Sequence, residues 1–84
     1  MNTDRLDLDL LRAFVAVAQS QSFTRAGELL FRSQSAISLQ IRKLEQITGE
    51  RLFSRTARRV TLTPAGERLM GYAERMLALH DEAL

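Results

Sequence analysis

The polar triplet Ser-Gln-Ser occurs twice, at residues 20–22 and 33–35, and interrupts a helical pattern of apolar residues. Serine side chains compete for backbone hydrogen bonds, so they favour helix caps and turns over helix interiors. Each triplet therefore predicts a turn between two helices. With 84 residues, the chain has enough length for one core and too little for two.

The first predicted helix runs from Asp7 to Gln19, with Asp7 as its N-cap. Because the capping role accounts for the Asp7 carboxylate, Asp7 and Asp9 are not expected to form a catalytic or metal-binding pair. Apolar side chains at helical spacing form the stripe that we expect to be buried: Leu11, Phe14, Val15 and Ala18.

The second predicted helix begins near Phe23 or Thr24 and ends at about Phe31. It is expected to bury Ala26, Leu29 and Leu30. A glycine inside a helix costs about 1 kcal/mol relative to alanine. Gly27 therefore predicts that another part of the backbone passes close to this helix.

A third helix is predicted from the cap Ser33 to Thr48, with Gly49 as its stop. At 100° per residue, Ile37, Ile41, Leu44 and Thr48 share one side. The opposite side mixes hydroxyls, an apolar side chain, an amide and a cation, a combination suited to a groove: Ser35, Ser38, Leu39, Arg42 and Gln46.

Residues 51–62 predict a small β-hairpin with an arginine-rich tip. Because an isolated two-stranded ribbon is marginally stable in water, it must pack on the helices. Leu52, Phe53 and Leu62 are the expected anchors. Arg55, Arg58 and Arg59 lie at or near the expected tip.

The last helix is predicted from Thr63, its N-cap, with Pro64 at the first helical position, to the final residue. Its apolar residues cover more than one stripe, which predicts a second packing partner. The expected seam with a second copy of the helix contains Leu69, Ala73, Met76, Leu77, His80 and Ala83. The alternative is a loosely amphipathic terminal helix without a partner.

Charge is distributed unevenly along the chain. Residues 1–31 carry three Arg and four acids, residues 32–59 carry seven Lys or Arg and two Glu, and residues 60–84 carry two Arg and four acids. A basic middle third between acidic flanks indicates a surface that binds a polyanion. The alternative is an ordinary solvated surface that happens to be basic.

Several other classes find little support in the sequence. The first residues do not form a signal peptide, and no apolar run is long enough to span a membrane. The absence of cysteine fits a cytoplasmic protein. With one histidine, no cysteine and no glycine-rich phosphate loop, no enzyme activity, metal or cofactor is expected. A pure interaction module would leave the basic segment unexplained, and RNA binding lacks stacking aromatics, since Tyr72 lies outside that segment.

Four separate segments, SFTRAGELL, SQSAISLQIRKLE, GERLF.R and LTPAG, resemble the N-terminal domain of LysR-type transcriptional regulators. The resemblance extends over nearly the whole chain. The shorter pieces LDLDLLR, QSAIS, GYAER and DEAL are similar to the LrhA and HexA branch of that family.

The resemblance implies a mainly α fold, a winged helix-turn-helix. Residues 1–62 would form the DNA-binding domain, with the helix-turn-helix at about 23–48 and the wing at about 51–62. Residues 63–84 would form a linker helix that pairs two protomers on an inverted-repeat operator in double-stranded DNA. The family's effector-binding domain is absent from these residues, and the parent regulator would be a tetramer that binds a small-molecule effector.

The resemblance also assigns roles to individual residues. Recognition-helix residues Gln34, Ser35, Ser38 and Leu39, beside the cap Ser33, would face the major groove. Thr24, Arg42 and Lys43 would contact phosphates, and Arg55, Arg58 and Arg59 would grip the backbone or minor groove. The sequence departs from the residue that many family members have at three positions. Ser35 stands in place of proline, Leu39 in place of arginine and Ala57 in place of glycine. Base readout should therefore depend on a Gln34 contact with adenine and on Leu39 beside a thymine methyl.

Overall fold

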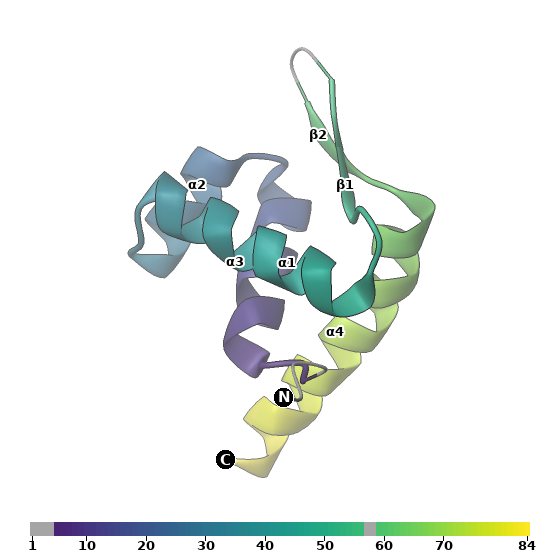
Figure 1. Ribbon diagram of the computed structural model, residues 1–84. Helices are drawn as coiled ribbons and strands as arrows, with labels where there is room; N and C mark the ends of the chain where they lie inside the picture. The colour runs from purple at the N-terminus through teal and green to yellow at the C-terminus, as the bar shows by residue number, and fades with distance from the viewer. Residues whose placement is uncertain (1–4, 57–58) are drawn as a thin grey trace.

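The computed structural model describes residues 5–56 and 59–84, and shows four helices and a two-stranded hairpin (Figure 1). The predicted mainly α, winged helix-turn-helix fold is confirmed. The expectations for Ala57 and Arg58 lie outside the described residues. No helix in the described part of the chain is long and apolar enough to cross a membrane. In order, the elements are α1 (Leu8–Ser20), α2 (Phe23–Leu30), α3 (Gln34–Thr48), β1 (Phe53–Arg55), β2 (Val60–Leu62) and α4 (Pro64–Ala83).

Side-chain caps start all four helices, because each first turn has amide protons without helical partners. Asp7 Oδ1 accepts from the Asp9 amide at 2.8 Å, which confirms the predicted cap. α1 and α2 end at residues in the left-handed conformation, Gln21 and Phe31, and α3 ends at Gly49 with φ of 75°. The other three helices are capped by Ser22, Ser33 and Thr63.

The core is built around α1, which packs against α2, α3 and α4. Phe14 is at its centre, with its ring centroid 5.4 Å from that of Phe53. Phe23 meets the same Phe53 ring edge-on at 6.1 Å. The aromatic cluster therefore joins the first two helices to the first strand of the wing. From α3, the predicted residues Ile37, Ile41 and Leu44 are all buried.

One predicted core residue of α2 is exposed. Leu29 was expected to be buried, but 53% of its surface is accessible. Phe23, Ala26 and Gly27 form the buried face of this helix, and Leu29 lies roughly 110° around the axis from the middle of that face. The prediction for Leu29 was wrong because an eight-residue helix needs only a narrow buried face.

Gly27 shows the close backbone approach that the sequence predicted. A Cβ atom at this position would lie 2.5 Å from the carbonyl oxygen of Arg32 and 3.5 Å from the backbone nitrogen of Gln34. The chain therefore turns tightly against α2 before α3 begins. This turn fixes the angle between the two helices of the helix-turn-helix.

The wing is an antiparallel hairpin in which Phe53 pairs with Leu62. Its base is attached to two helices. The Leu52 amide donates to Glu45 of α3 at 2.8 Å, and the Thr63 amide, at the cap of α4, donates to the Leu52 carbonyl at 3.0 Å. The orientation of the wing is thus tied to both α3 and α4.

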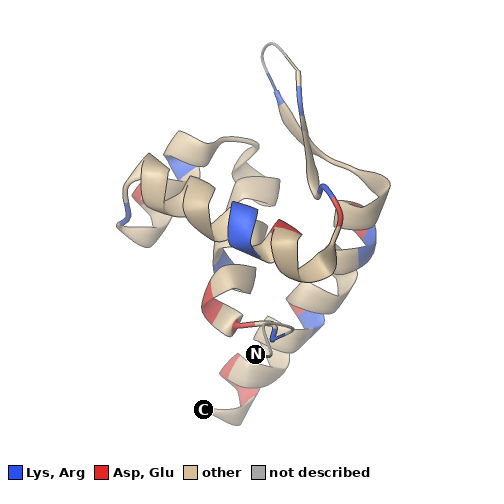
Figure 2. Ribbon diagram, viewed as in Figure 1, with Lys and Arg blue, Asp and Glu red and all other residues tan. Residues whose placement is uncertain are grey.

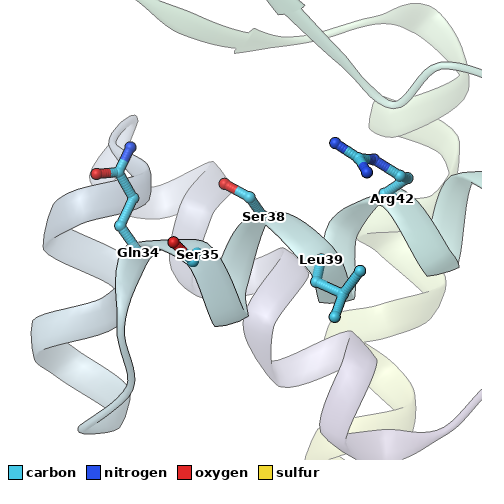
Figure 3. A pocket seen from close by; sticks show the side chains of 5 residues that line it. All are labelled: Gln34, Ser35, Ser38, Leu39 and Arg42. Atoms are coloured by element: carbon cyan, nitrogen blue, oxygen red, sulfur yellow. The ribbon is translucent and has the colours of Figure 1, made fainter.

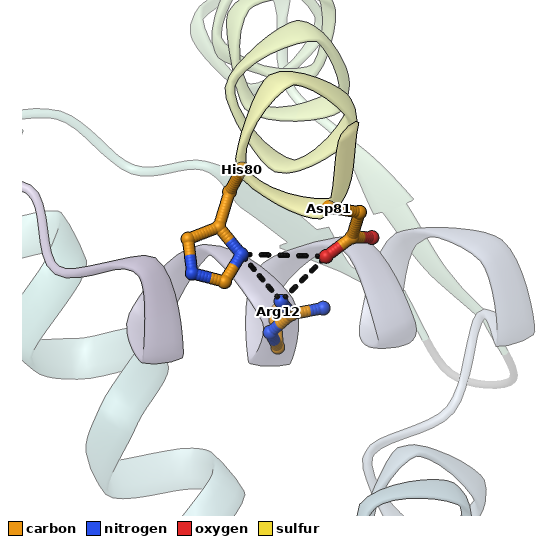
Figure 4. Close-up of polar contacts among 3 residues, drawn as sticks. All are labelled: Arg12, His80 and Asp81. Atoms are coloured by element: carbon orange, nitrogen blue, oxygen red, sulfur yellow. Dashed lines mark hydrogen bonds and ion pairs between the residues drawn. The ribbon is translucent and has the colours of Figure 1, made fainter. Parts of the chain in front are cut away.

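Helix α4 packs along α1, and polar contacts join the last turn of α4 to Arg12 within α1 (Figure 4). Arg12 Nη2 lies 3.1 Å from Asp81 Oδ1 and 3.3 Å from His80 Nδ1. Ala73, expected in the seam with a second copy, has no accessible surface because it packs into this chain's own core. The assignment of Ala73 to an intermolecular seam was therefore wrong.

Candidate nucleic-acid interface

The outward face of α3 forms an open hollow that contains most of the predicted base-reading residues. Figure 3 shows Gln34, Ser38 and Arg42 projecting to one side of the helix, while Leu39 projects to another. Leu39 is 63% exposed although it is apolar. A hollow with hydroxyl, amide, methyl and guanidinium groups matches the chemistry of base edges in a DNA groove. Its lining residues are Gln34, Ser35, Ser38, Leu39 and Arg42.

Arg42 and Lys43, adjacent on α3, are both exposed. Within residues 5–56 and 59–84, neither has a carboxylate within ion-pair distance. Figure 2 shows basic residues on α3 and on the wing, with acidic residues at the far end of α4. The charge of α3 is therefore available to an external anion.

Two smaller residues predicted to contact DNA are placed at helix starts. Thr24 is exposed in the first turn of α2. Ser33 is exposed too, but its hydroxyl accepts from the Ala36 amide at 3.1 Å. Ser33 therefore has a structural task, the capping of α3.

The wing arginines differ in their surroundings. Arg59 is exposed just before β2. Arg55, at the end of β1, lies over the ring of Phe23, with its guanidinium carbon 4.3 Å from the ring centroid. Sequence reasoning missed this contact, because residues 32 positions apart give no local signal. Arg58 lies outside the described residues.

A second arginine of the basic middle third, the exposed Arg32, forms an intramolecular ion pair. Arg32 forms an ion pair with Asp9 of α1 at 2.9 Å. The charge pattern of the sequence places Arg32 among the cations that we expect to bind a polyanion. In three dimensions its charge is matched by a carboxylate.

Two helices joined by a tight turn, followed by a basic hairpin, define the class: this is a winged helix-turn-helix domain. Residues 8–67 match the protein family described as "Bacterial regulatory helix-turn-helix protein, lysR family". The chain belongs to the LysR family of bacterial regulatory proteins.

Named relatives are similar over almost the whole chain. The chain is 48% identical over 79 residues to the HTH-type transcriptional regulator DgdR of Burkholderia cepacia, covering 94% of this chain. It is 48% identical over 86 residues to the HTH-type transcriptional regulator PecT of Dickeya dadantii, covering 98%. The chain spans 27% of the length of each of these relatives. The finer resemblance to LrhA and HexA stays a prediction.

Solved structures of the family have the same fold. The BenM DBD in complex with benA site 1 DNA superposes with a TM-score of 0.88 at 40% identity, over 93% of this chain and 88% of that one. The CbnR DBD–DNA complex superposes with a TM-score of 0.88 at 32% identity, over 93% and 90%. Both similar structures are complexes with DNA.

Proposed function

We propose that this chain is the sequence-specific, double-stranded DNA-binding domain of a transcriptional regulator. The observation that carries the proposal is the exposed face of α3, where Arg42 lines the polar hollow and neither it nor Lys43 has a carboxylate partner in the described part of the chain. The division proposed is a DNA-binding part, residues 1–62, and a linker helix, residues 63–84. The proposal places the domain at the bacterial nucleoid, in the cytoplasm.

Affinity would come mainly from phosphate contacts. Arg42, Lys43 and Arg59 would each release counterions on binding, adding about −0.9 to the slope of log affinity against log salt. Thr24, at the start of α2, would donate its hydroxyl to a further phosphate. Arg58 is proposed to act with Arg59, as the sequence predicts. Arg55 would contribute mainly by orienting the wing, because its guanidinium already covers Phe23.

Sequence choice would come from α3 inserted into the major groove. The exposed amide of Gln34 can pair with N7 and N6 of adenine, and the exposed Leu39 can contact a thymine methyl. Ser35 and Ser38 can donate to or accept from base edges. These four side chains offer no positive charge, so they add selectivity while the cations add affinity.

A homodimer would place two copies of α3 on an inverted repeat, with half-site centres spaced by the helical repeat of DNA. The α4 residues expected in the seam are partly committed to this chain's own core, since Leu69, Met76 and Leu77 pack against it. The outward side of α4 carries Tyr72 and Leu79, which are 59% and 64% exposed. We propose that Tyr72, Met76, Leu79 and Ala83, in steps of four, three and four, form the partner-facing stripe, in which the half-buried Met76 contacts its own core with one side and the partner with the other, and His80 lies at the edge.

Binding of the purified chain to a random duplex and to a duplex selected from a random pool tests the function. Fluorescence anisotropy at moderate salt should show binding to both, with the selected duplex bound more tightly. Equal binding to both duplexes would contradict sequence-specific recognition. Absence of binding to either would leave a protein-interaction module as the better account.

Sedimentation equilibrium tests the dimer separately. The chain should dimerise, and Leu79→Glu should shift it toward monomer, while the exposed polar change Glu74→Gln, on the opposite side of the same helix from Tyr72 and Leu79, should not. A wild-type chain that stays monomeric at high micromolar concentration would remove the α4 dimer and leave DNA binding standing. The tetrameric parent regulator and its small-molecule effector are proposed from family membership.

A further inference from the structure

A single carboxylate on α1 holds two parts of the helix-turn-helix. Asp9 Oδ2 accepts from Arg32 Nη1 and Asp9 Oδ1 accepts from Arg32 Nη2, both at 2.9 Å. Asp9 Oδ2 also accepts from Gln40 Nε2 at 3.3 Å. Two parallel hydrogen bonds between a guanidinium and a carboxylate fix direction as well as distance. We name Asp9, Arg32 and Gln40 the α1 clamp.

One partner of Asp9 lies in the turn before the recognition helix and the other lies within that helix. Arg32 directly precedes Ser33, the N-cap of α3, and its own amide donates to the Gly27 carbonyl at 2.8 Å. Gln40 belongs to the middle of α3, about 160° around the axis from Ser38. The clamp therefore restrains the start and the middle of α3 from the side away from the hollow.

The Gln40 amide has little other restraint. Its Oε1 atom is buried and lacks a hydrogen-bond partner in the described part of the chain. The hydrogen bond to Asp9 is thus the polar contact that orients this side chain. Removing the Asp9 carboxylate would release Gln40 and Arg32 together.

The charge of Arg32 could serve either of two purposes. A cation in the turn before α3 could contact a phosphate, as Arg42 and Lys43 are proposed to do. However, hydrogen bonds from Arg32 hold the pKa of Asp9 below its ordinary value of 3.8, so the carboxylate is charged and paired at neutral pH. The geometry favours a structural link within the domain over a contact with DNA.

We propose that Asp9 and Arg32 are positioning residues that set the orientation of α3 for base readout. The inference rests on the proposed function. Without the clamp, α3 would still present its cations to phosphates, but Gln34 and Leu39 would meet base edges less accurately. Discrimination between sequences should fall while the number of phosphate contacts stays the same.

The test measures two quantities for the 84-residue chain and its Arg32→Gln variant. One is the affinity ratio between the selected duplex and a random duplex, and the other is the slope of log affinity against log salt. Arg32→Gln should lower the ratio about fivefold or more, equivalent to one weak base contact. The salt slope should stay within error of the wild type, because no phosphate contact is lost.

Two further variants and a control separate positioning from net charge. Asp9→Asn raises the net charge by one, yet it should lower the ratio as Arg32→Gln does. The double variant Asp9→Asn/Arg32→Gln keeps the wild-type net charge and should show the same loss. Arg5→Gln, which removes an exposed cation just before α1, should leave the ratio unchanged.

The opposite pattern would overturn the inference. A salt slope shallower by about 0.9 with an unchanged ratio would make Arg32 a phosphate contact. Unchanged ratio and slope in a folded variant would leave the clamp without a role in readout. If Arg32→Gln does not fold, Arg32→Lys, which keeps the charge but loses the paired hydrogen bonds, must show the reduced ratio. Failure of the wild-type chain to bind either duplex would instead defeat the proposed function.

Discussion

The guanidinium of Arg55 lies over the ring of Phe23, 4.3 Å from its centroid, and so attaches the end of β1 to the start of α2. A cation over an aromatic face at an exposed site contributes about 0.5–1 kcal/mol. This contact extends the aromatic cluster of Phe14, Phe53 and Phe23 to the surface. It gives the wing a fixed attachment to the first residue of α2, next to Thr24 in the sequence.

A double-mutant cycle of Phe23→Leu and Arg55→Gln should therefore show a coupling free energy of about 0.5–1 kcal/mol. Urea denaturation of the wild type, both single variants and the double variant supplies the four values. Phe23→Leu also loses core packing, but the cycle subtracts that cost. A coupling free energy of zero within error would show that the contact between Arg55 and the Phe23 ring does not stabilise the domain.

Two glycines of α4 should respond to alanine in opposite directions. A Cβ at Gly66 would collide with the Leu52 carbonyl and lie 2.9 Å from Leu62 Cδ2, while one at Gly71 would meet no atom of the described residues within 4 Å besides its own helical turn and chain neighbours. Gly66→Ala should destabilise the domain by more than about 1 kcal/mol through forced movement of the wing base. Gly71→Ala should stabilise it by about 0.5–1 kcal/mol through helix propensity. Thermal unfolding measures both, and stabilisation by both variants would contradict the close contact.

Stability should fall in acid partly through Asp9 and Asp81. Hydrogen bonds from Arg32 lower the pKa of Asp9, and hydrogen bonds from Arg12, then His80, lower the pKa of Asp81, each from its ordinary value of 3.8. Groups with a lower pKa in the folded state stabilise it fully above the unfolded pKa and lose that contribution as pH falls through the folded pKa.

The free energy of unfolding should therefore differ most between wild type and the Asp9→Asn variant at pH 6. The difference should shrink once the pH is below the ordinary carboxyl pKa, because Asp9 then binds a proton first in the unfolded chain and, as the pH reaches its lowered pKa, in the folded chain too. Urea denaturation at pH 6 and pH 3 supplies the comparison. A difference that grows toward pH 3 would mean that the charged form of Asp9 is not the stabilising one.

Gln34 and Arg59 should have different effects on binding. Gln34→Ala should relax preference at one base position, at a cost of about 1–3 kcal/mol on the preferred base. Arg59→Ala should weaken binding to all duplexes alike and reduce the salt slope by about 0.9. Titrations of the selected duplex and its single-base variants make the comparison. Equal losses on every sequence for Gln34→Ala would remove it from base readout.

The helix boundaries could be predicted from the sequence because their signals are local. Asp7, Ser33 and Thr63 cap helices through atoms two or three residues away. Gly49 ends α3 in a conformation that glycine favours. The buried face of α3 could be predicted because its apolar residues recur at helical spacing, and in a long helix this spacing clearly separates the apolar side from the polar side.

Packing partners could not be predicted in the same way. The stripe of α4 that contains Ala73 faces this chain's own α1, whereas Tyr72 and Leu79 point outward. Apolar periodicity reveals two stripes but does not say which of them a second molecule covers. Likewise, the pairing of Asp9 with Arg32 spans 23 residues, and the tertiary fold alone brings the two side chains together.

The central claim is that the exposed face of α3 and the wing form one DNA-binding surface. Titration of the ¹⁵N-labelled chain with its selected duplex, followed by amide chemical shifts, tests that claim most directly. The largest changes should fall at residues 33–43, at Thr24 and at the wing residues from Arg55 to Arg59. Changes confined to α4, with the amides of Gln34, Ser38 and Arg42 unaffected, would contradict the account.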